Sequence, residues 1–135
     1  MNLTLREKIG QLVLYSMEGN TLDPDTLNTL RDYKIGNIIH FGNNVQGFDD
    51  ARALNAQLND IIAENCSGVR PLISVDHEGG RVQRFRSEFT DVPAMSEIAA
   101  HEDAEARFEA AGLVLAAELR ACGVDFTFAP VLDVD

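Results

Sequence analysis

The chain has 135 residues, the size of one ordinary domain, and its apolar fraction of 45% suffices for a hydrophobic core. Its net charge of −11 argues against nucleic-acid binding, which needs a basic face, and against binding to anionic membrane surfaces. Cys66 and Cys122 form no C-x-x-C pair, so neither a zinc site nor a disulfide scaffold is expected. The N-terminus lacks an apolar signal core and no run reaches transmembrane length, so we expect a cytoplasmic protein without membrane contact.

The first element is a short helix, predicted by Thr4 and Glu7 at the spacing of a capping box. Residues 12–15 either continue it or begin a first strand. Caps and apolar faces at helical spacing predict three longer helices, at residues 24–35, 49–64 and 103–122. The segment 86–93 shows no clear hydrophobic periodicity, and residues 94–99 are predicted to form one helical turn.

Between these helices lie three compact apolar runs that predict buried strands, at residues 38–41, 72–75 and 124–130. The runs are apolar throughout and do not alternate, so we expect both faces of the sheet to be covered. Strands and helices follow one another in turn. The order indicates a parallel sheet with crossover helices in one α/β domain.

The most informative stretch follows the strand at 72–75. Asp76, His77 and Glu78 come directly after it, and Gly79-Gly80 then turns the chain. The carboxyl end of a parallel strand is where α/β proteins bind ligands. Two carboxylates there can hold a metal, act as acid and base, or accept hydrogen bonds from sugar hydroxyls. A metal site needs more ligands than this stretch supplies.

Two arginines in the same stretch, Arg81 and Arg84, allow two interpretations of it. In a plain turn, Asp76 caps a backbone amide and Glu78 pairs with Arg81 or Arg84. Alternatively, Arg84 folds back across the strand tip and holds a ligand oxygen or a carboxylate. Carboxylates two residues apart on one tip seldom flank a scissile bond, so Asp76 and Glu78 indicate binding more than catalysis.

Other polar residues are weaker candidates. His40 lies within an expected buried strand and is interpreted as a core histidine, whereas His101 is expected to be exposed at a helix start. Asp133 and Asp135 follow the last strand and either line the same mouth as Asp76 or cap turns. Neither a phosphate-binding loop nor a G-x-S-x-G sequence is present.

The stretch at 73–85, I-S-V-D-H-E-G-G-R-V-Q-R-F, resembles the D-x-E-G-G-x-V-x-R signature of family 3 glycoside hydrolases. The resemblance is strongest to the β-N-acetylglucosaminidase (β-N-acetylhexosaminidase) branch. Further segments agree with that branch in the same order and at similar spacing, namely residues 7–12, 36–44, 89–95 and 128–135. The resemblance therefore extends over the whole chain, residues 1–135.

The resemblance implies a TIM-like (β/α)8 barrel, of which this chain contains the N-terminal part, about four βα units, as an incomplete domain. It implies that Asp76 and Arg84 bind the non-reducing N-acetylglucosamine of a saccharide, with Glu78, Arg81 and Asp133 as candidate pocket support. The family's retaining mechanism uses an aspartate nucleophile and a histidine acid/base backed by an aspartate. All of these lie downstream of the P-V-L-D-V-D segment, so no catalytic residue is expected here.

The implied enzyme removes terminal N-acetylglucosamine from peptidoglycan fragments without a cofactor or metal, and the 135-residue chain alone is expected to be inactive. Two alternatives remain open at this point. One is a non-catalytic sugar-binding module that self-associates through uncovered sheet edges. The other is a fragment of a family 3 β-glucosidase or xylosidase.

Overall fold

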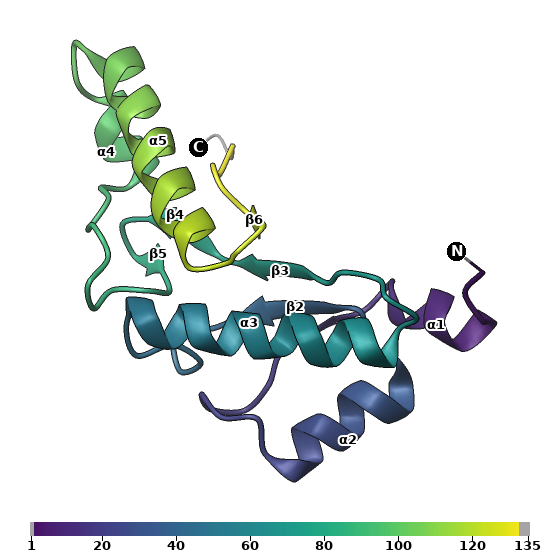
Figure 1. Cartoon of the computed structure of the whole chain (residues 1–135). Helices are drawn as coiled ribbons and strands as arrows, with labels where there is room; N and C mark the ends of the chain where they lie inside the picture. Colours follow the sequence, from purple (N-terminus) through teal and green to yellow (C-terminus); the bar gives the residue numbers. More distant parts are fainter. Residues whose placement is uncertain (1, 133–135) are drawn as a thin grey trace.

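A four-stranded parallel sheet carries the fold (Figure 1). The structure is a computed structural model and describes residues 2–132. The strands are β1 (Leu14–Tyr15), β2 (Asn37–His40), β3 (Leu72–Val75) and β6 (Phe126–Thr127), in the order β1-β2-β3-β6. Every pairing in this sheet is parallel, so all four carboxyl ends lie at one edge. The predicted parallel α/β arrangement is confirmed.

Within the described residues, one helix precedes the first strand and four more lie between successive strands. They are α1 (Leu5–Gly10), α2 (Pro24–Tyr33), α3 (Phe48–Asn65), α4 (Met95–Ala99) and α5 (Ala104–Ala121). The predicted capping box is confirmed, because Thr4 accepts from the Glu7 amide while the Glu7 side chain accepts from the Thr4 amide. The Glu7 carboxylate also accepts from Ser67 Oγ at 2.5 Å, which ties α1 to the end of α3. These hydrogen bonds lower the pKa of Glu7 to about 2.

The core lies between one face of the sheet and the helices α2 and α3 (Figure 1). Ile38 of β2 and Ile73 of β3 are fully buried against Leu58 and Ile62 of α3. Leu30 closes the same cluster from α2. Each such side chain contributes about 1.5–3 kcal/mol by its removal from water, so this layer holds the sheet in place.

The opposite face of the sheet is open, which corrects the expectation that both faces are covered. Leu14, Leu72 and Phe126 share that face by strand register and are 42%, 41% and 44% exposed. No element among residues 2–132 packs over them. The apolar residues of this second face suit burial, but the described residues cover only the first face.

A small antiparallel ribbon follows β3 and was not predicted. It consists of β4 (His77–Gly79) and β5 (Val82–Gln83). Gly79 and Gly80 have φ of 90° and 57°, a backbone conformation that only glycine adopts readily, so the predicted turn is confirmed. Strands of two or three residues are too short to give a periodic sequence signal.

Candidate functional site

Asp76 and Arg84 meet at the carboxyl edge of the sheet. Asp76 directly follows β3, and Arg84 directly follows β5. The Arg84 Nη2 atom lies 3.4 Å from Asp76 Oδ2, and the two side chains remain 34% and 25% exposed. Charge-assisted hydrogen bonds are usually shorter, about 2.7–2.9 Å, so both groups keep hydrogen-bonding capacity for a ligand. Of the two alternatives that the sequence left open for Arg84, the structure shows the one in which it folds back across the strand tip to the Asp76 carboxylate.

The aromatic ring of Phe41 lies beside the Arg84 guanidinium. Phe41 follows β2, and its ring centroid lies 5.4 Å from the guanidinium carbon of Arg84, within cation–π range. The Phe41 amide donates to Asn44 Oδ1 at 2.7 Å, and the buried Asn44 amide group donates to Met17 and Gly19 carbonyls. These bonds fix the loop that carries Phe41. Phe41 was not among the predicted site residues, because a single aromatic residue at a strand end gives no sequence signal until its spatial neighbour is known.

The other candidate residues do not join this pair. Glu78 lies in β4, and within the described residues it forms an ion pair with neither Arg81 nor Arg84. Arg81 is exposed at the turn between β4 and β5. Asp133 and Asp135 lie outside the described residues. Among these candidates in the described residues, Asp76 and Arg84 form an ion pair, and Glu78 and Arg81 form none.

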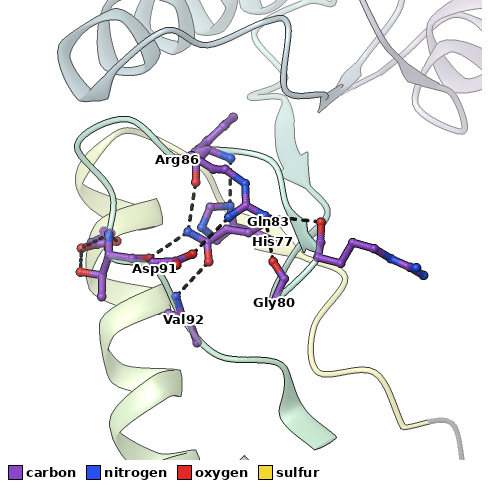
Figure 2. A network of polar contacts seen from close by, with 10 residues as sticks. His77, Gly80, Gln83, Arg86, Asp91 and Val92 are labelled. Atoms are coloured by element: carbon purple, nitrogen blue, oxygen red, sulfur yellow. Dashed lines mark hydrogen bonds and ion pairs between the residues drawn. The ribbon is translucent and has the colours of Figure 1, made fainter. Parts of the chain in front are cut away.

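A buried polar network fastens the ribbon to the segment after it (Figure 2). Gln83 Nε2 donates to the carbonyls of Phe85 at 3.2 Å and Thr90 at 2.9 Å, and Gln83 Oε1 accepts from the Val92 amide at 3.0 Å. The Gly80 amide donates to Val92 O at 2.7 Å. Residues 86–93 lack sequence periodicity because they form no helix or strand; hydrogen bonds from the Gln83 side chain and from the Gly80 backbone hold them.

His77 is fully buried and accepts a hydrogen bond from the Phe85 amide at Nδ1, 3.4 Å away. Its ring centroid lies 5.6 Å from that of Phe85 and 6.1 Å from that of Phe89. Burial lowers the pKa of His77 to about 4; Glu118 opposes the shift and Arg86 adds to it. His77 is therefore a neutral structural group at pH 7.

His40 is the core histidine that was predicted. It is fully buried, and its Nε2 lies 2.6 Å from Asn55 Oδ1 on α3. Burial lowers its pKa as well, although the Asn55 hydrogen bond opposes the shift.

Acidification is expected to destabilise the fold through these histidines. Between pH 6.5 and about 4, only unfolded chains bind the His77 proton, so the free energy of unfolding falls as pH falls and levels off below that range. The His77 share is on the order of 2 kcal/mol after allowance for solvent screening. Thermal unfolding from pH 4 to 8 should show a shallower slope for His77→Phe, while the exposed His101→Gln keeps the original slope. An unchanged slope in His77→Phe would contradict this assignment.

Within residues 2–132, no group of three or more His, Cys, Asp or Glu side chains is placed to hold a metal ion. In the same range, no helix combines the length and the apolar character needed to cross a membrane. Cys66 and Cys122 are buried free thiols, and burial raises the pKa of Cys122 to about 11.

Two hollows occur elsewhere on the described surface. One of about 300 Å³ lies between α4 and α5, and one of about 430 Å³ is lined by α1 and α2. Neither includes Asp76 or Arg84, because this pair sits at the open edge of a sheet with one uncovered face.

Comparison with known proteins identifies the family. Residues 4–135 match the Glycosyl hydrolase family 3 N terminal domain. The chain belongs to glycoside hydrolase family 3. It is 46% identical to a β-hexosaminidase of Bordetella pertussis over 129 residues, which cover 91% of this chain and 35% of that protein. The family 3 resemblance drawn from residues 73–85 is therefore confirmed.

Solved structures of the family agree. A family 3 β-N-acetylglucosaminidase from Paenibacillus sp. str. FPU-7 superposes with a TM-score of 0.91 at 37% identity, covering 98% of this chain and 25% of that one. NagZ from Neisseria gonorrhoeae, in complex with N-trifluoroacetyl-D-glucosamine, gives 0.79 at 37% identity, covering 91% and 37%. The chain thus spans about a third of the length of the curated relatives that it matches.

Proposed function

We propose that this family 3 chain forms the N-terminal part of a retaining β-N-acetylhexosaminidase and binds the terminal N-acetylglucosamine of its substrate through Asp76 and Arg84. The observation that carries the proposal is the Asp76–Arg84 pair, partly exposed at the carboxyl edge of the sheet with spare hydrogen-bonding capacity. The names of the relatives support the sugar, since they are β-hexosaminidases and one was solved with a glucosamine derivative.

The chemistry of the pair suits a sugar. An ionised carboxylate only accepts hydrogen bonds and a guanidinium only donates them, whereas each sugar hydroxyl does both. Asp76 therefore accepts from hydroxyl groups, and Arg84 donates to hydroxyl or carbonyl oxygens. The Phe41 ring limits the positions open to the Arg84 guanidinium.

We assign bond cleavage to groups other than Asp76 and Glu78. Two carboxylates that act on one glycosidic bond must lie on opposite sides of it. Asp76 and Glu78 share one strand tip, and Glu78 belongs to the β4–β5 ribbon. In this proposal the nucleophile and the acid/base come from the region that the relatives have beyond the matched third.

The sheet is proposed to form part of a TIM-like (β/α)8 barrel, with residues 1–135 as one partial domain. Such a barrel usually needs about 250 residues. The open face carries the apolar side chains of Leu14, Leu72 and Phe126 beside the polar Asn37 and Ser74, and these apolar side chains suit the packed interior of a barrel. Without the remaining strands, this face and the outer edges of β1 and β6 favour self-association.

The proposed substrates are peptidoglycan fragments with terminal N-acetylglucosamine, hydrolysed in the cytoplasm. Two buried free thiols are compatible with that reducing compartment. The relatives favour a hexosaminidase specificity over a β-glucosidase or xylosidase specificity.

The proposal is tested with a joined protein, in which residues 1–135 are followed by the part of Neisseria gonorrhoeae NagZ that lies beyond the matched region. The joined protein is expected to hydrolyse 4-nitrophenyl N-acetyl-β-D-glucosaminide, and the 135-residue chain alone is expected to give no turnover. The corresponding β-glucoside and β-xyloside serve as controls and should react at least ~100-fold more slowly, because they lack the acetamido group of the proposed substrate.

Turnover by the isolated chain would contradict the assignment of the nucleophile to another region. A folded joined protein that cleaves the glucoside or xyloside best would contradict the substrate. A stable oligomer of the isolated chain that binds N-acetylglucosamine would favour the sugar-binding module instead.

A further inference from the structure

The sugar-binding pair sits next to a buried pair on the same ribbon. In the β4–β5 register, His77 lies opposite Gln83. Asp76 precedes His77 and Arg84 follows Gln83, so the two pairs are adjacent on the ribbon. Side chains alternate between faces along extended strands. The buried pair, 0% and 4% exposed, faces the protein, while Asp76 and Arg84 remain partly exposed.

The ribbon is too short to hold its own register. β5 has 2 residues and β4 has 3, and the pairing is irregular between His77 and Gly79. An isolated two-stranded ribbon is marginally stable in water. A slip of one residue would exchange the faces, turning Arg84 inward and Gln83 outward. Other contacts must therefore fix which residues face the sugar.

Gln83 provides such contacts on β5. Both amide hydrogens and the amide oxygen are used, in bonds to Phe85 O, Thr90 O and the Val92 amide (Figure 2). These three partners are backbone atoms, so Gln83 fits in one position only. The segment is anchored further by Thr90, whose Oγ1 donates to Glu118 of α5 at 2.5 Å.

His77 provides the equivalent contacts on β4. Its Nδ1 accepts from the Phe85 amide, directly after Arg84 in the chain. Its backbone amide donates to Thr127 Oγ1 at 3.3 Å, and that hydroxyl donates to His77 O at 3.4 Å, which joins β4 to β6. His77 thus fixes the backbone next to Asp76, and Gln83 fixes the backbone next to Arg84.

We propose that His77 and Gln83 are positioning residues, which lock the ribbon register and thereby aim Asp76 and Arg84 at the terminal N-acetylglucosamine. The inference rests on the proposed sugar-binding role of Asp76 and Arg84. It adds that affinity for the sugar depends on two side chains that do not face it.

Substitutions at Gln83 test the proposal in the joined protein. Gln83→Met removes all three amide hydrogen bonds at similar volume and is expected to raise KM about tenfold, with a smaller change in kcat, because the pair is misplaced before and during reaction. Ile62→Val, in the core of α3, is the control that lowers stability without touching the ribbon. It is expected to leave KM unchanged; an unchanged KM in Gln83→Met, or an equal rise in Ile62→Val, would overturn the proposal.

Substitutions at His77 separate positioning from packing. Asparagine can place an acceptor near the position of Nδ1 but leaves a cavity, whereas phenylalanine fills the space and removes the acceptor. His77→Asn should therefore lose more thermal stability but keep KM within about threefold, and His77→Phe should keep more stability but raise KM about tenfold. If KM simply follows the loss of stability, His77 is a packing residue and the proposal fails.

A measurement independent of turnover reports on Arg84 directly. In the joined protein labelled with ¹⁵N-arginine, with the Arg84 signal assigned by Arg84→Lys, the Nε–Hε order parameter should approach the rigid value of about 0.85 and fall below about 0.6 in Gln83→Met. Equal order parameters in both proteins would contradict the positioning role. If Asp76→Ala leaves KM unchanged, the proposed function itself fails, an outcome distinct from a failure of Gln83→Met alone.

Discussion

Replacing Asp76 with alanine in the joined protein is expected to lower kcat/KM by about 10³, equivalent to about 4 kcal/mol. The substitution removes the acceptor for sugar hydroxyls. It also leaves the Arg84 guanidinium without the carboxylate partner that lies 3.4 Å from it in the unsubstituted protein. Steady-state hydrolysis of 4-nitrophenyl N-acetyl-β-D-glucosaminide measures the effect. Arg84→Lys keeps the charge but loses the planar fork and should cost about 10–100-fold.

The matched control is Asp91→Ala. Asp91 also pairs with an arginine, Arg86, at 3.1 Å, but its side chain is 84% exposed and does not contact Asp76 or Arg84. An exposed ion pair contributes about 0–1 kcal/mol, so kcat/KM should stay within about twofold. Equal losses in Asp76→Ala and Asp91→Ala would show that the loop as a whole, and not Asp76, carries the effect.

Gly10→Ala is expected to destabilise the joined protein by about 3 kcal/mol. Because this chain covers 37% of NagZ, the joined protein is long, and Tm should fall by only about 4 °C. Gly10 ends α1 where its carbonyl accepts from the Gly36 amide at 3.0 Å, and a methyl group there would overlap the carbonyl oxygen of Lys34. Because that obstacle is backbone, α1 must move away from the end of α2. Thermal unfolding of the joined protein measures the loss.

Gly112→Ala provides the opposite control for Gly10→Ala. Gly112 lies within α5, and a methyl group there meets no atom within 4 Å. Alanine favours helix over glycine by about 0.5–1 kcal/mol, so this variant should be slightly more stable. A Gly10→Ala protein as stable as Gly112→Ala would contradict the close packing of α1 on the end of α2.

Local signals made much of the fold predictable. The apolar run before Asp76 gave β3 with its observed bounds, because turn residues limit it on both sides. The family signature at residues 73–85 predicted Asp76 and Arg84 as site residues, and eight residues of separation proved enough for the chain to fold back and bring the two side chains into contact.

The remaining features depend on contacts that are distant in sequence. The ribbon register rests on Gln83 reaching Thr90 and Val92, and Phe41 reaches Arg84 across the sheet edge. Neither contact leaves a periodic pattern. Coverage of the second sheet face was wrongly predicted because an apolar strand such as β3 shows that burial is favourable, without showing what supplies it.

The most direct test of the account is a crystal structure of the joined protein with N-acetylglucosamine bound. We expect sugar hydroxyl oxygens at hydrogen-bond distance, about 2.6–3.2 Å, from both the Asp76 carboxylate and the Arg84 guanidinium. A sugar bound in the active site with both side chains more than ~4 Å away would contradict the assignment of these residues to the substrate pocket.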